Sequence, residues 1–160
     1  IGCAGCGWRG ARMTDEGLLY AVSRYDLRGF LIEPASIDPY LQRSAIQAGP
    51  NALMQVGPLW QQLMEVLPEL ADGVPVEGTP ALHCWVWPAD RVEEGVQRLQ
   101  ALDAGVFSQR MQALQASNAA GGLALDQLEM LRQLVRLQAE LRVFLQAAAG
   151  RRDAALLYVV

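Results

Sequence analysis

Apolar residues recur every three or four positions near the end of the chain, and this spacing predicts a helix over residues 125–149. The positions of its inner face are Met130, Leu134, Leu137, Leu141 and Phe144, widened by Leu128, Leu131 and Val135. Gly150 follows the last turn, as is typical of a helix end. The apolar run over residues 153–160 then predicts a buried final strand.

Two sets of side chains alternate strictly along one segment in the middle of the chain, ALHCWVWP at residues 81–88. Leu82, Cys84 and Val86 alternate there with His83, Trp85 and Trp87. A period of two is typical of a strand, so Trp85 and Trp87 share one face of it.

Two helices are predicted after this strand. The first begins with a capping-box pattern at Asp90 and Glu93, and its inner positions are Val92, Val96, Leu99 and Leu102. The second covers residues 105–116, with Val106, Met111 and Leu114 apolar.

The first half of the chain is less regular. Residues 1–8 predict a glycine-rich strand, and Thr14 is the predicted N-cap of a helix. The inner face of that helix would be Leu18, Leu19, Val22 and Tyr25. A short helix is predicted over residues 39–48 with Asp38 as its cap, and a longer one over residues 51–70 with a kink at Gly57-Pro58.

Together these elements predict a single α+β domain over residues 1–160. Its sheet would hold about three strands, from the N-terminal, central and C-terminal parts of the chain, packed with five or six helices. A chain of 160 residues is long enough to bury roughly 70% of its unfolded surface.

Composition narrows the function classes. The chain is 52% hydrophobic and 19% charged with a net charge of −4, which is typical of a globular protein and argues against nucleic-acid binding. No apolar run reaches the length of a membrane span. Lysine is absent and all 13 basic residues are arginine, which excludes Schiff-base catalysis and a P-loop and suggests a GC-rich bacterial genome.

Three cysteines, an odd number, favour a reducing cytoplasm over a disulfide framework. The chain begins at Ile1 and not at methionine, so whether Ile1 is the native N-terminus or follows a removed segment stays open.

Four short segments carry a resemblance to a known family. The first is residues 2–5 followed by residues 13–16, and the second is a tryptophan-centred helix that includes residues 59–63 and ends near Gly73. The third is residues 88–92 followed by 99–103, and the fourth is a long helix that ends at Gly150-Arg151 and is followed by the apolar residues 155–160. The chain thereby resembles the YfbM-like family of small bacterial proteins of unknown function. The resemblance implies an α+β fold and a cytoplasmic location, and it implies no activity.

This sequence departs from the family pattern at two places. Members usually carry Asp-Lys before the helix tryptophan and a histidine soon after it, whereas Val56-Gly57-Pro58 precedes Trp60 here and Leu63-Met64 follows. The loop before the central strand also looks shortened, to residues 74–80. If the polar family residues form a site, their replacement removes it here, whereas the effect of the shortened loop on such a site stays open.

The spacing of Cys3 and Cys6 is that of zinc knuckles and of thiol redox sites. Successive side chains of a strand point to opposite faces, so the two thiols point apart unless the chain turns at Gly5. His83 and Cys84, the residues that would complete a zinc site, also point apart. We therefore expect a core strand, with Cys3 and Cys6 as alternative metal or redox residues, and no cofactor.

The remaining candidates are aromatic. His83 has no evident partner for catalysis in the sequence, so a hydrogen-bonded, half-exposed histidine is expected. Trp85 and Trp87, with Trp8 and His83 nearby, form either part of the core or an aromatic patch for a partner protein.

The sequence thus favours a non-enzymatic module that binds another protein, for example a toxin-neutralising immunity protein. The alternative is a small-molecule-binding protein or enzyme with a pocket near Arg12, Trp60, His83 and Trp85. A homodimer through the 125–149 helix is a third possibility. An exposed Trp85–Trp87 patch would favour the binding module, and a lined cavity would favour the pocket.

Overall fold

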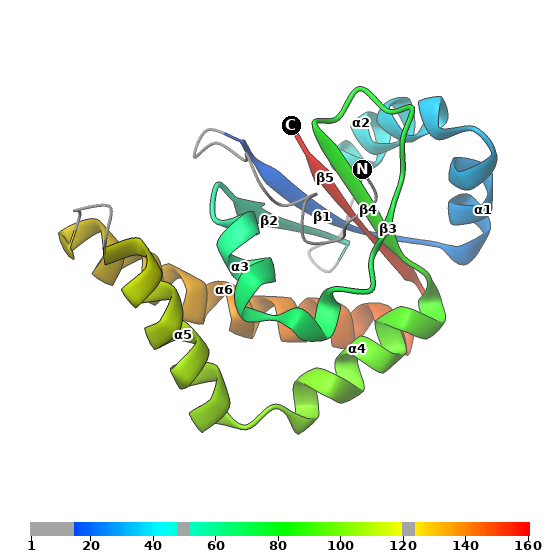
Figure 1. Ribbon diagram of the computed structural model, residues 1–160. Coiled ribbons are helices and arrows are strands. Elements are labelled where there is room, and N and C mark those ends of the chain that lie inside the picture. The colour runs from blue at the N-terminus through cyan, green and yellow to red at the C-terminus, as the bar shows by residue number, and fades with distance from the viewer. Residues whose placement is uncertain (1–14, 48–51, 120–123) are drawn as a thin grey trace.

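A computed structural model describes residues 15–47, 52–119 and 124–160 of the chain (Figure 1). Within these residues the fold is α+β, built on one antiparallel sheet with the strand order β2-β1-β5-β4-β3. The strands are β1 (Gly17–Val22), β2 (Leu53–Gly57), β3 (Val74–Pro75), β4 (His83–Trp87) and β5 (Ala154–Val159).

The C-terminal strand lies in the middle of this sheet. β5 pairs with β1 on one side and with β4 on the other, and all six of its residues are buried. A strand that is covered on both faces needs apolar side chains at every position, and the sequence AALLYV of β5 provides them. The predictions of strands at the centre and the end of the chain are confirmed.

Helices cover both faces of the sheet. The α-helices of the described residues are α1 (Arg24–Ile32), α2 (Ile37–Gln47), α3 (Trp60–Val66), α4 (Ala89–Ala101), α5 (Ala104–Ala119) and α6 (Ala124–Gly150), with short 3-10 helices at Pro34–Ser36 and Pro68–Leu70. α1 and α2 pack on one face, and α3 to α6 pack on the other (Figure 1).

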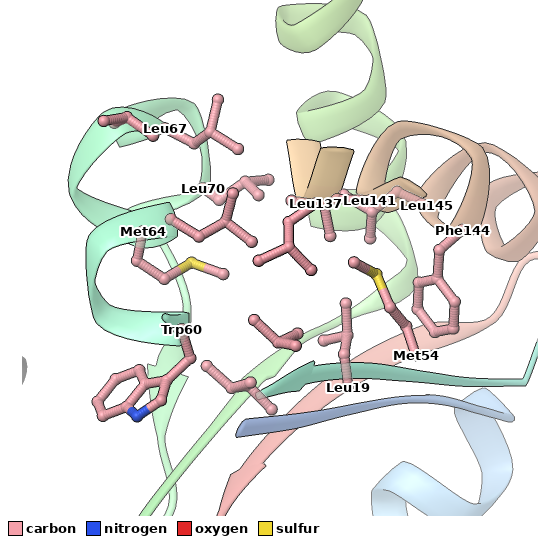
Figure 2. Packing of buried hydrophobic residues seen from close by; sticks show 14 of the residues in the cluster. Leu19, Met54, Trp60, Met64, Leu67, Leu70, Leu137, Leu141, Phe144 and Leu145 are labelled. Atoms are coloured by element: carbon pink, nitrogen blue, oxygen red, sulfur yellow. The ribbon is translucent and has the colours of Figure 1, made fainter. Parts of the chain in front are cut away.

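Two hydrophobic cores result, because alternate residues of each strand point to opposite faces. The larger core joins Leu19, Trp85 and Leu157 of the sheet to the inner face of α6, and Figure 2 shows Met64 of α3 and Leu137 of α6 packed above Leu19. The smaller core joins the other strand positions to α1 and α2 and contains Tyr20, Cys84, Val86, Leu156 and Tyr158.

The prediction of about three strands is wrong in number, because the described residues contain five. The segment predicted as a helix from Thr14 is strand β1 over Gly17–Val22. Its apolar run is buried between β2 and β5, and a run buried on both faces has no period that separates strand from helix. The helix begins only after Ser23, whose side-chain oxygen accepts a hydrogen bond from the backbone N–H of Asp26 at 3.1 Å. The predicted strand at residues 1–8 and Thr14 itself lie outside the described residues.

Residues 51–70 are not one helical segment either. Residues Leu53–Gly57 form strand β2, and α3 begins at Trp60. Gly57 has a φ of 75°, a left-handed conformation that favours glycine and ends the strand.

Two predicted caps are also wrong. Asp38 lies inside the first turn of α2, and Pro88 occupies the N-cap of α4 without a side-chain hydrogen bond. By contrast, the long C-terminal helix is confirmed in α6 with Leu134, Leu137, Leu141 and Phe144 buried, and Val92 and Leu99 are buried in α4 as expected. The predicted widening of the α6 inner face by Leu128 and Val135 is wrong, because these side chains are 51% and 53% exposed.

Candidate functional site

Three of the aromatic candidates meet in the structure. The ring of His83 stacks on Trp85 with centroids 5.1 Å apart, and the Trp60 ring lies 5.6 Å from His83 and 5.9 Å from Trp85. β4 supplies two of these rings, and the first residue of α3 supplies the third. The structure therefore brings together three of the four residues that the sequence analysis grouped around a possible pocket.

This aromatic cluster (Trp60, His83 and Trp85) is mostly closed. Trp60 is 0% exposed and Trp85 is 7% exposed, whereas His83 is half-buried. Burial lowers the pKa of His83 below its ordinary value, and the negative charge of Asp15 opposes that shift. His83 is therefore a neutral imidazole at pH 7 and acts there as an aromatic neighbour of two indoles.

Trp87 has a structural role on the same face of β4. Its indole N–H donates a hydrogen bond of 3.0 Å to the carbonyl of Leu70 in the buried interior. Gly73 packs so closely on this ring that an added Cβ would lie 2.8 Å from it. Trp85 and Trp87 are thus core residues, and the interpretation of the pair as an exposed aromatic patch is wrong.

Two arginines, Arg91 and Arg110, form hydrogen bonds to the turn that follows α3 and contains Leu70. Arg110 pairs with Glu69 at 2.7 Å and also donates to the carbonyl of Val66, and Arg91 donates to the carbonyl of Asp72 at 2.6 Å. These donors satisfy carbonyl groups left open at the end of α3 and the following 3-10 helix. The bonds connect α4 and α5 to the turn that carries the Trp87 contact.

A polar cluster on the opposite face of the sheet was not foreseen. The Tyr158 hydroxyl donates to Asp38 Oδ1 at 2.7 Å, across 120 positions of sequence. Burial is the largest cause that raises the pKa of Tyr158, and the hydrogen bond to Asp38 and the charge of Asp38 raise it further. Burial, with a smaller contribution from the charge of Asp38, also raises the pKa of Tyr20. Burial raises the pKa of the Cys84 thiol to about 12, so the thiol stays protonated and a poor nucleophile at neutral pH.

The Cys84 thiol makes stability depend on alkaline pH. An unfolded thiol loses its proton near 9.0, whereas the folded one keeps it to about 12. Between these values the unfolded state binds fewer protons, so the free energy of unfolding falls as pH rises, by about 1 kcal/mol between pH 9 and pH 10. Urea unfolding at both pH values measures this fall. The fall should be smaller by that amount in Cys84→Ala, and equal falls in the two proteins would contradict the assignment.

Helix α1 carries an exposed apolar patch. Tyr25 is 68% exposed, Leu31 51% and Ile32 85%, and the guanidinium carbon of Arg24 lies 5.3 Å from the centre of the Tyr25 ring. We call Arg24, Tyr25, Leu31 and Ile32 the α1 patch. Sequence reasoning placed Tyr25 on the inner face of a helix begun at Thr14. The actual start at Ser23 rotates Tyr25 to the outside.

A groove of about 760 Å³ separates the edge strand β2 from α6. Its lining is Leu53, Met54, Gln55, Arg136, Ala139, Glu140, Val143 and Phe144. These side chains offer apolar contact and one pair of opposite charges.

Cys3, Cys6, Trp8 and Arg12 lie outside the described residues. Within the part of the chain that the structure describes, no group of three or more His, Cys, Asp or Glu residues could hold a metal ion. None of the helices described is both long and apolar enough to cross a bilayer.

Comparison with known proteins adds no relative. No protein-family model, no curated protein and no solved structure matches this chain. The resemblance to the YfbM-like family stays a prediction.

Proposed function

We propose that this protein is a non-enzymatic, cytoplasmic bacterial module that binds another protein through the α1 patch. The observation that carries the proposal is the exposure of Tyr25, Leu31 and Ile32 on one helix of nine residues. Exposing large apolar side chains together costs solubility, and clusters of this kind mark interaction sites. Tyrosine and arginine, both present in the patch, are enriched among residues that dominate binding energy.

The side chains of the α1 patch indicate what kind of partner surface would be complementary to it. Arg24 and Arg28 add positive charge beside the apolar side chains of the same helix. The matching surface would be an apolar pocket bordered by carboxylates. A bacterial toxin neutralised by an immunity protein is the concrete form that we propose, with no cofactor involved.

A pull-down of the tagged full chain from its host lysate tests the α1 patch. The wild-type protein and Leu82→Glu should capture the same partner in stoichiometric amount, because Leu82 is 60% exposed but lies outside the patch. Ile32→Glu should lose it, since the substitution places a charge where the partner offers an apolar surface. Both variants change exposed side chains and should keep the stability of the wild type within about 0.5 kcal/mol. Retention of the partner by Ile32→Glu would exclude the α1 patch.

The contacts among Trp60, His83 and Trp85 support a second candidate, a small-molecule or enzyme pocket beside the half-buried His83. A ligand bound at such a site would quench the fluorescence of Trp60 and Trp85. The substitution His83→Ala would abolish this quenching, whereas Ile32→Glu would not. In the pull-down, by contrast, Ile32→Glu should lose the partner and His83→Ala should keep it, so the two experiments together distinguish the two candidates.

A further inference from the structure

Helix α6 has apolar residues on two opposite faces. The inner face, which includes Leu134, Leu137, Leu141 and Phe144, is buried on the sheet. Leu128, Val135 and Val143 are 51%, 53% and 64% exposed, and Ala139 is exposed between the two valines. Val135, Ala139 and Val143 are spaced by four, so they form one stripe along the outside of the helix. We call these three residues the outer stripe.

Charged residues border the outer stripe unequally. Arg136 and Glu140 lie on the flank that faces β2, where they line the groove together with Ala139 and Val143 of the outer stripe. Arg142 lies on the other flank, where it lines a cavity beside α4. Arg136 and Glu140 pair with one another at 3.7 Å, and their side chains are 70% and 50% exposed, so both remain accessible to a second molecule.

We propose that a second copy of this chain docks on the outer stripe, with the two α6 helices antiparallel and a two-fold axis at Ala139. The order of side chains along the stripe is symmetric about this residue. Val135 would face the partner's Val143, and Val143 would face the partner's Val135. Ala139 would meet the partner's Ala139, and two small side chains let the helices approach closely.

Charge complementarity selects a second copy over another protein segment. In a two-fold antiparallel pair, each flank of a helix meets the same flank of its partner. Arg136 would therefore lie beside the partner's Glu140, and Glu140 beside the partner's Arg136, giving two ion pairs across the axis. A flank with only one sign of charge would repel itself in this arrangement.

This inference goes beyond the proposed function and does not depend on it. α1 and α6 lie on opposite faces of the sheet (Figure 1), so the dimer leaves both α1 patches accessible. A dimer would present two copies of the patch and increase the avidity for a partner with two binding sites.

Sedimentation equilibrium of the full chain tests the dimer. The wild-type protein should reach twice the chain mass of 17.5 kDa with rising concentration. Val143→Glu should raise the dissociation constant by about tenfold or more, because each dimer would bury two carboxylates in an apolar contact. Ile32→Glu, an apolar-to-acid change on the α1 patch, should leave it unchanged. A mass of one chain at every concentration, or an unchanged dimer in Val143→Glu, would overturn the proposal.

A charge exchange tests the register of the helices. Arg136→Glu and Glu140→Arg should each weaken their own homodimer about tenfold, because like charges then meet across the axis. A mixture of the two single variants should form mostly heterodimer, since every cross-axis pair is again of opposite sign. The pair within each helix stays like-charged in that mixture, so the gain can come only from contacts between chains. Native mass spectrometry reads the ratio, and a random ratio of homodimers to heterodimer would overturn the proposed axis.

Discussion

Replacing Trp60 with alanine is expected to lower the free energy of unfolding by about 3–5 kcal/mol. The side chain is 0% exposed and contacts the rings of His83 and Trp85, and its Cβ also packs on β1 at Gly17. Figure 2 shows Trp60 at the edge of the larger core, where α3 meets the sheet. Alanine would leave a cavity between a helix and a central part of the sheet, and rigid strands limit how far it can collapse.

Urea unfolding followed by far-UV circular dichroism measures this loss. Trp60→Phe keeps an aromatic ring and should lose less than Trp60→Ala. Tyr25→Ala removes an aromatic ring that is 68% exposed, so its free energy of unfolding should stay within about 0.5 kcal/mol of the wild type. A loss below about 1 kcal/mol for Trp60→Ala would mean that the aromatic cluster is not part of the core.

Adding one methyl group at Gly17 is expected to cost about 3 kcal/mol, a large effect for the smallest possible change. A Cβ at this position would lie 2.6 Å from the Cβ of Trp60 and 3.0 Å from its Cγ. Neither atom lies at the flexible end of a side chain. Gly17 also pairs with Gly57 of β2 and with Val159 of β5, so its backbone is held on both sides and has little freedom to move away.

Gly29→Ala provides the matched control. Gly29 lies within α1, and no atom would lie within 4 Å of an added Cβ. There alanine should raise the free energy of unfolding by about 0.5–1 kcal/mol, because glycine is the poorer helix former and loses more entropy on folding. Thermal and urea unfolding of both variants should give opposite signs, and equal losses would contradict the close contact at Gly17.

The elements that were predicted correctly carry their own local signal. The inner face of α6 repeats at helical spacing over many turns, and β4 alternates cleanly between Cys84 and Val86 on one face and Trp85 and Trp87 on the other. Two strands, β1 and β2, were predicted as helices, and their short apolar runs take the strand conformation from hydrogen bonds to β5 and to each other. Such pairing joins residues far apart in the chain, so no local window contains it.

For the candidate site, too, some features could be predicted from the sequence and others could not. Sequence alone singled out Trp60, His83 and Trp85 as a group, because aromatic residues and a lone histidine are conspicuous in composition. It could not assign their exposure, which depends on the helices packed over that face of the sheet. The contact between Asp38 and Tyr158 and the outward position of Tyr25 carry no sequence signal, since each depends on where a distant or neighbouring element begins.

For this protein the amino-acid sequence by itself determined the fold class, the long C-terminal helix, two strands and the lack of lysine chemistry. Those properties follow from local periodicity and from the residue types present. Only the tertiary structure decided that Trp85 and Trp87 are core residues, that the α1 patch and the outer stripe of α6 are exposed, and that the flank of α6 with Arg136 and Glu140 faces β2. Burial and proximity are properties of packed elements, and packing brings together residues that are distant in sequence.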